Sequence, residues 1–103
     1  MSLLLFVTAE YHNKAEYDRY VELSTPIFIR EGVNVMGNDE EAAFFDLPGD
    51  KAILLEFRDK AHMKHFFALP DYQKAAKHRD AGATMRMVRF RRFPSLGSKS
   101  GPT

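Results

Sequence analysis

The stretch from residue 47 to residue 58 reads LPGDKAILLEFR and decides the fold. Its first four residues are a strong turn signal, because proline and glycine supply the backbone angles that tight turns need. The next eight residues are rich in aliphatic side chains and predict a β-strand. The apolar segment at residues 42–47 precedes the turn, so the sequence predicts a β-hairpin whose strands are residues 42–47 and 51–58.

Toward the N-terminus, this hairpin is preceded by a strand, a helix and a strand piece. Residues 3–11 read LLLFVTAEY and predict a strand, and residues 33–36 predict a short strand piece. Between them, Asn13 is an N-cap candidate for a helix with apolar residues every three or four positions. Pro26 is predicted to interrupt and bend this helix, and Gly32 to end it.

Toward the C-terminus, the pattern is again a helix followed by a strand. Asp59 is the second N-cap candidate, Pro70 divides the helix that follows, and Gly82 ends its second part. Residues 84–93 predict the last strand. The order β-α-β-β-α-β is that of the ferredoxin-like fold, an α+β fold with an antiparallel sheet and its helices on one face.

The length of 103 residues predicts one domain. We assign it to residues 1–93 and predict that the polar tail at residues 94–103, PSLGSKSGPT, is disordered. The chain has no cysteine, which excludes disulfides, thiol nucleophiles and cysteine-ligated metals. The apolar run near the N-terminus is too short for a signal peptide or a membrane span, so we expect a cytoplasmic protein that does not enter membranes.

The predicted strands are apolar on both faces. A sheet with one face in water alternates apolar and polar residues, whereas residues 3–7 read LLLFV and residues 52–55 read AILL. A second copy of the same sheet, related by a twofold axis, would cover the face that the helices leave open. We therefore expect a homodimer, because large exposed apolar patches are unusual on soluble monomers.

Positive charge gathers at the end of the chain. Up to residue 80 there are ten basic and fourteen acidic residues, and beyond it Arg86, Arg89, Arg91, Arg92 and Lys99 stand without an acid. A basic strand with interleaved aromatic residues is one form of nucleic-acid surface. Here the arginines divide between the two strand faces and the overall charge is only +1, so we expect no nucleic-acid partner.

Four side chains are candidates for binding a small molecule between helices and sheet. Arg79 shares a helix face with Tyr72, and Tyr17 and Tyr20 belong to the apolar stripe of the first helix. Arg79 is suited to a substrate carboxylate, and the tyrosines to an apolar pocket with a few hydroxyls. The alternative is structural: Arg79 paired with a carboxylate such as Glu56, and tyrosines packed in the core. We favour it because buried charges need partners in any case.

Catalytic candidates are fewer, and none is oriented by a neighbour in sequence. His12 lies at the first strand–helix junction and is a candidate general base, although a solvated loop position explains it as well. His65 is expected to border the pocket or solvent, and His62 to be exposed. His62 and His65 have a spacing that can bind metal, but no third ligand has suitable spacing, so we expect no metal site. Glu56 is the third candidate catalytic residue, beside His12 and His65.

Two segments are similar to a known family. The helix sequence FALPDYQKAAKHR, with Pro70, Asp71, Tyr72, Gln73 and Arg79, resembles a signature of domain-of-unknown-function family 1330. The first helix, EYDRYVELSTPIFIREG, resembles the corresponding helix of that family. The resemblance implies the dimeric α+β barrel superfamily, which includes muconolactone isomerases, cofactor-free monooxygenases and haem-degrading enzymes.

The resemblance leaves the activity open. One hypothesis is a cofactor-independent enzyme, of isomerase or monooxygenase type, that acts on a small organic acid or aromatic compound. The alternative is a non-catalytic small-molecule-binding or interaction module. The haem-degrading relatives use a tryptophan that this chain lacks, and we expect no cofactor.

Overall fold

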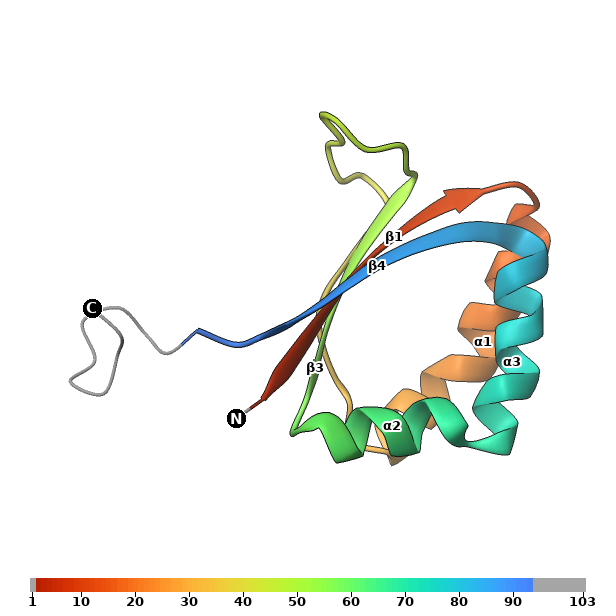
Figure 1. The fold of residues 1–103 in the computed structure, drawn as a ribbon. Helices are drawn as coiled ribbons and strands as arrows, with labels where there is room; N and C mark the ends of the chain where they lie inside the picture. Colours follow the sequence, from red (N-terminus) through yellow and green to blue (C-terminus); the bar gives the residue numbers. More distant parts are fainter. Residues whose placement is uncertain (1, 94–103) are drawn as a thin grey trace.

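The computed structural model describes residues 2–93, which form one antiparallel sheet and a layer of helices. The elements in chain order are β1 (Leu3–Tyr11), α1 (Lys14–Arg30), β2 (Asn34–Asp39), β3 (Lys51–Phe57), α2 (Lys60–Ala68), α3 (Pro70–Gly82) and β4 (Ala83–Arg91). The strand order is β2-β3-β1-β4, and the helices lie on one face of the sheet (Figure 1). The predicted ferredoxin-like α+β fold is confirmed. The tail at residues 94–103 lies outside the described residues.

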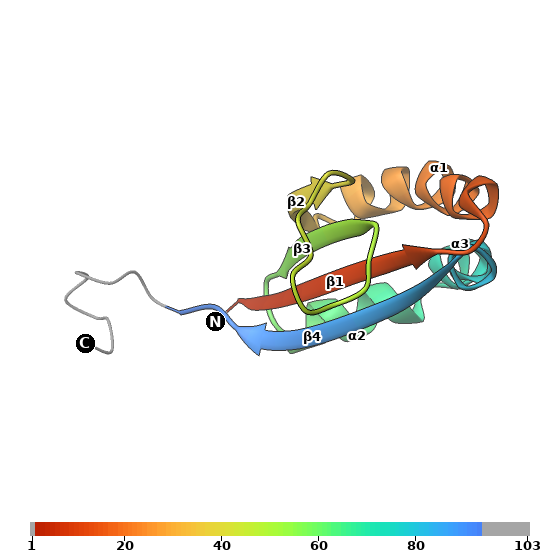
Figure 2. The same cartoon turned by 90° about the horizontal axis from the view of Figure 1, so that it is seen from above.

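Strand β1 is central and pairs with β3 on one side and β4 on the other (Figure 2). Because side chains alternate along a strand, Leu5 and Val7 point to the helices and are buried, as is Leu55 opposite Leu5. Phe6 points to the other face, where it pairs with Leu54 on β3 and Val88 on β4. The apolar run of β1 therefore places apolar side chains on both faces of the sheet.

The predicted strand at residues 42–47 is wrong. On the side away from β1, the partner of β3 is β2, whose pairing ends with Asp39 opposite Ala52. Residues 40–50 lie beyond that last pair and connect the two strands as a loop, so no ladder position remains for residues 42–47. Phe44 folds back against Gly49 within the loop, and Phe45 is 91% exposed.

Helix α1 begins and ends at the predicted residues. The side chain of Asn13 accepts a hydrogen bond from the backbone N–H of Glu16 at 3.3 Å and caps the helix. Gly32 has a φ of 67°, a left-handed conformation that suits glycine at a helix C-terminus. Pro26 does not interrupt the helix, which continues to Arg30.

Pro70 divides the second helical region as predicted. Asp59 caps α2 through the backbone N–H of His62 at 2.8 Å, and α2 ends at Ala68. Leu69 is extended, as residues before proline usually are, and Pro70 takes the first position of α3. The α2 side chain of Phe66 is fully buried and packs on Phe28, with ring centroids 4.9 Å apart. Within residues 2–93, the helices lack the length and apolar character needed to cross a bilayer.

The end of α3 lies against the start of α1 at Gly82. The carbonyl of Gly82 accepts hydrogen bonds from the backbone N–H groups of His12 and Asn13, at 2.8 and 3.0 Å. A Cβ atom at this position would lie 2.5 Å from the backbone nitrogen of Tyr17 and 2.8 Å from the carbonyl oxygen of Asn13. Only glycine allows this approach of backbone to backbone.

We expect the substitution Gly82→Ala to destabilise the protein by about 1–3 kcal/mol, because α1 and α3 must move apart to admit the methyl group. The matched control is Gly37→Ala, where the new Cβ would lie 3.7 Å from its nearest neighbour, an ordinary contact. Urea unfolding of both variants measures the difference. Equal free energies of unfolding for the two variants would contradict the packing argument.

Candidate functional site

A cavity of about 430 Å³ lies between the sheet and the helices. This volume falls within the range of sites for small molecules. The sheet side is mainly apolar and includes Leu5, Val7, Ile53, Leu55, Met85 and Met87, with the polar side chains of Asn38 on β2 and Lys51 on β3. The helix side is formed mainly by α1, including Tyr17, Tyr20, Ser24 and Phe28, with Phe67 from α2 and Tyr72 and Arg79 from α3.

Hydrogen bonds connect the polar groups on the helix side of the cavity. The hydroxyls of Tyr20 and Tyr72 are 2.8 Å apart, and Nη1 of Arg79 donates to the Tyr72 hydroxyl at 3.1 Å. The guanidinium carbon of Arg79 is 6.0 Å from the ring centroids of both tyrosines. Its Nε donates to Asp80, 3.0 Å away and largely exposed. Arg79 is thereby held at the cavity wall with its charge only partly neutralised.

Lys51 is a second cation of the cavity, and the sequence analysis missed it. The residue opens β3, is 5% exposed and has its Nζ atom 5.0 Å from the ring centroid of Tyr17. In the described part of the chain, no carboxylate lies within 4.0 Å of this amine. A lysine directly after a turn is usually solvated, so its position in the sequence gave no signal of burial.

The charge of the cavity is positive. Its lining contains Arg79 and Lys51 and, within residues 2–93, no aspartate or glutamate. Burial lowers the pKa of Lys51, with weaker opposing effects from Glu40 and Asp18. Burial is the largest single effect on Arg79 and acts to lower its pKa, but the hydrogen bond to Asp80 together with the electrostatic effects of Tyr72, Asp80 and Tyr20 outweighs it, so the pKa lies above its usual range. An anionic group is the ligand that these walls favour.

The tyrosine hydroxyls of the cavity are hydrogen-bond donors at neutral pH. Burial raises the pKa of Tyr17 to about 12 and raises that of Tyr20 further. Tyr17 is 1% exposed, and among the described residues its hydroxyl has no hydrogen-bond partner. These phenols are therefore suited to donating a proton to a hydrogen bond with an anion, not to removing one from a substrate.

The structure brings together four of the residues that the sequence singled out. Tyr17, Tyr20, Tyr72 and Arg79 all line the cavity. They come from α1 and α3, which are far apart in the sequence and lie side by side in Figure 1. The apolar stripe of α1 and the Tyr-to-Arg spacing of α3 carried the signal for all four.

Glu56, one candidate partner for Arg79 in the sequence, does not pair with it. Glu56 lies on β3 with its side chain on the face away from the helices, because it alternates with Leu55 and Phe57. There it accepts hydrogen bonds from Ser2 at 2.9 Å, Asn34 at 3.1 Å and Arg92 at 3.0 Å. Glu56 is thus separated from the cavity by the sheet.

The histidine candidates lie outside the cavity lining. His12 is exposed and contacts the hydroxyl of Thr84. His65 is also exposed, with its Nε2 atom 3.3 Å from Glu31. His62, which was expected to be exposed, is 5% exposed. Its Nδ1 accepts from the backbone N–H of Arg58 at 3.0 Å and its Nε2 is 2.8 Å from the carbonyl oxygen of Glu31. This arrangement fixes the neutral imidazole, with the proton on Nε2.

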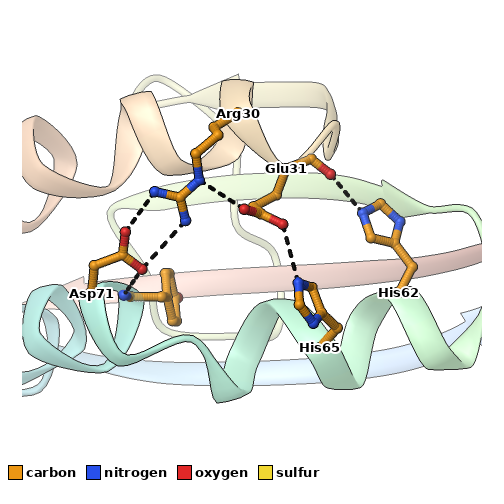
Figure 3. Close-up of polar contacts among 6 residues, drawn as sticks. Arg30, Glu31, His62, His65 and Asp71 are labelled. Atoms are coloured by element: carbon orange, nitrogen blue, oxygen red, sulfur yellow. Dashed lines mark hydrogen bonds and ion pairs between the residues drawn. The ribbon is translucent and has the colours of Figure 1, made fainter.

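Polar contacts fasten the three helices at the end of the cavity formed by Phe28 and Phe67 (Figure 3). Arg30 at the end of α1 donates to Asp71 at the start of α3 at 2.7 Å and to Glu31 at 2.7 Å. Glu31 also meets His65 of α2. Across residues 2–93, no three histidine or acidic side chains gather in a way that would hold a metal ion.

The fold and the cavity define a ferredoxin-like α+β protein with a positively charged site between its sheet and its helices. The model of the family described as "Domain of unknown function (DUF1330)" matches residues 3–93, and the chain belongs to this family. Among curated proteins, none matches the sequence significantly.

Solved structures with similar folds share little sequence with the chain. The RPA0582 protein of unknown function from Rhodopseudomonas palustris has a TM-score of 0.78 and 19% identity, over 91% of this chain and 84% of that one. SnoaB, a cofactor-independent oxygenase from Streptomyces nogalater, has a TM-score of 0.70 and 14% identity, over 94% and 98%. A dimeric ferredoxin-like protein of unknown function from Jannaschia sp. CCS1 has a TM-score of 0.67 and 17% identity, over 88% and 99%.

We expect the contacts of Asp71 and Glu31 to make stability depend on pH. The hydrogen bonds from Arg30 lower the pKa of both carboxyls, so their contribution to stability is present above the ordinary carboxyl pKa, near 4, and is lost as the pH falls through the lowered folded-state values. The double variant Asp71→Asn, Glu31→Gln should therefore be less stable than the wild type at pH 7, and the difference should shrink as the pH is lowered to 2.

Urea midpoints at the two pH values measure this difference. The control is Glu41→Gln, Asp46→Asn, which removes two exposed acids of the 40–50 loop that have no ion pair within residues 2–93. If the double variant Asp71→Asn, Glu31→Gln is less stable than the wild type by the same amount at both pH values, the ion pairs are not the cause of its lower stability.

Proposed function

We propose that this protein binds a small organic acid with an apolar or aromatic body in the cavity of each subunit of a homodimer. The observation that supports this most is the pairing of an apolar cavity with two cations and no acidic side chain in the described lining. Buried cations are costly unless an anion neutralises them. A ligand carboxylate supplies that anion, and its hydrocarbon part fills the space between the leucines, methionines and tyrosines.

Arg79 is the group that we propose binds the ligand carboxylate. Its side chain is 16% exposed, it lines the cavity and it is oriented by Tyr72 and Asp80. A planar guanidinium forms two parallel hydrogen bonds to a carboxylate, which fixes the orientation of the acid as well as its position. The tyrosine hydroxyls nearby supply further donors.

Turnover of the bound acid without a cofactor is the second candidate function. If the acid binds at Arg79, then Arg79 and the phenols of Tyr20 and Tyr72 would lie near negative charge that develops on it during proton transfer or oxygenation, and fixed donors of this kind stabilise such charge. The fold similarity to SnoaB is compatible with this candidate and, at 14% identity, concerns the fold alone.

We propose that the sheet face opposite the helices is the dimer interface. Leu54, Phe6 and Val88 form a row across β3, β1 and β4 on that face, and Val88 is 52% and Phe90 44% exposed. An apolar row of this kind is the surface that a second copy of the sheet would bury. The relative from Jannaschia sp. CCS1 is described as dimeric, which supports the proposal.

Replacing Arg79 with alanine should weaken binding of benzoate and hexanoate by about 10–100-fold, because a charge-assisted hydrogen bond is lost. Isothermal titration calorimetry measures the affinity, and nuclear magnetic resonance of the same acids in deuterium oxide shows whether any is converted. The control is Arg19→Ala, which removes an exposed arginine paired with Glu22 on α1.

Unchanged affinity in a folded Arg79→Ala variant would refute the ligand-binding role of Arg79. If that variant does not fold, Arg79→Lys takes its place, since it keeps the charge and loses the planar fork. Conversion of an acid by the wild type alone would establish an enzyme, and binding without conversion a carrier or sensor of acids.

The wild type should be a dimer at micromolar concentration, and Val88→Glu should be a folded monomer because it places a charge in the proposed interface. Native mass spectrometry of the purified protein measures the assembly and any ligand that it carries. Ala61→Glu, at an exposed position of α2, is the control and should remain dimeric. A monomeric wild type would refute the proposed interface.

A further inference from the structure

Lys51 has a place in the structure that the binding of one carboxylate by Arg79 leaves unexplained. It lies on β3 in the same alternation as Ile53 and Leu55, which line the cavity, so its side chain points to the helices. The residue is 5% exposed, and its amine lies beside the Tyr17 ring, 5.0 Å from the ring centroid. A cation–π contact of this kind offsets only part of the cost of burying the charge.

The acids near Lys51 are engaged by other groups. Glu40 accepts a hydrogen bond from the Tyr11 hydroxyl at 2.8 Å and lies 3.5 Å from the amine of Lys14. Asp18 lies 2.9 Å from the same Lys14 amine. Within residues 2–93, neither acid comes within 4.0 Å of Lys51, and no other carboxylate does. Lys51 is therefore a largely buried residue on a cavity wall, and its amine has no carboxylate within 4.0 Å among the described residues.

The two cations of the cavity flank a pair of aromatic rings. Tyr17 and Tyr20 have ring centroids 5.6 Å apart. Lys51 lies at the Tyr17 ring, and the guanidinium of Arg79 lies 6.0 Å from the Tyr20 ring. The side chains between the two charges are thus aromatic, and the rest of the strand lining is mainly aliphatic. A ligand that meets both cations carries an anionic group at each end and an apolar segment between them.

We propose that Lys51 is a second anion-binding group of the cavity and that the ligand is a small dicarboxylic acid with an apolar or unsaturated middle. This inference rests on the proposed function and narrows its class of ligand. Arg79 binds one carboxylate through its planar fork, and Lys51 neutralises the other as a point charge. A monocarboxylic acid of the same size leaves Lys51 buried without an anion, and the cavity discriminates against it for that reason.

The experiment compares acids of matched size and different charge. Terephthalate and its monomethyl ester, and hexanedioate and its monomethyl ester, are titrated by calorimetry into the wild type, Lys51→Met and Arg79→Ala. We expect the wild type to bind at least one diacid on the order of ten-fold more tightly than its half ester. Lys51→Met, which keeps the length of the side chain and removes the charge, should bind the half ester as before and lose the preference for the diacid.

The control for Lys51 is Lys14→Met, which removes a nearby lysine outside the cavity lining and should leave the preference unchanged. Binding of both half esters without any preference for the diacids, or a preference that survives in Lys51→Met, would overturn this inference and leave the proposed function standing. Failure of all four acids to bind the wild type would overturn both. If Lys51→Met does not fold, the comparison of diacid and half ester in the wild type decides alone.

Discussion

The close approach of α3 to α1 at Gly82 is the constraint on which the rest of the structure depends. The two helices lie side by side and approach each other closely (Figure 1). Gly82 holds them together at one end through backbone contacts, and Arg30 with Asp71 holds them at the other. Two helices that are joined to each other at both ends need not lie flat on the sheet. The space that remains between the pair and the sheet is the cavity.

The chemistry of the cavity follows from which strands and helices border it. Alternation along β3 directs Lys51, Ile53 and Leu55 to the helices and Glu56 to the opposite face. The one acid of this strand is therefore kept away from the cavity, while its lysine is placed inside. The positive character of the site is a consequence of strand register, and a shift of β3 by one residue would reverse it.

Much of the fold could be predicted from the sequence because its signals are local. Asn13 and Asp59 as caps, Gly32 as a helix end and Pro70 as a division all act within a few residues of themselves. The strand at residues 42–47 could not be judged in that way, because its apolar residues fit a strand and only the pairing of β2 with β3 leaves it without a partner. A sequence pattern indicates only the propensity of a segment to form a strand. Whether the segment becomes a strand depends on tertiary pairing with a neighbouring strand.

The difference between local and long-range signals also explains which residues of the cavity could be predicted from the sequence. Tyr17, Tyr20, Tyr72 and Arg79 could be found because they repeat at helical spacing on buried faces. Lys51 and the burial of His62 could not, since each depends on an element distant in sequence: Tyr17 of α1 for the lysine, and the carbonyl of Glu31 for the histidine. The proposed pairing of Arg79 with Glu56 failed for a related reason, as it required a face of β3 that turns away from α3.

The apolar run of β1 connects the two parts of the proposed function. Leu5 and Val7 border the cavity, and Phe6 between them lies in the row of the proposed dimer interface. In the proposed liganded dimer, Leu5 and Val7 would face the ligand and Phe6 would face the second copy. A strand that is packed on both faces would be rigid. Rigid elements hold binding groups more accurately than loops do. The proposed function therefore accounts for the lack of alternation in the sequence, because both faces of the strand would be covered.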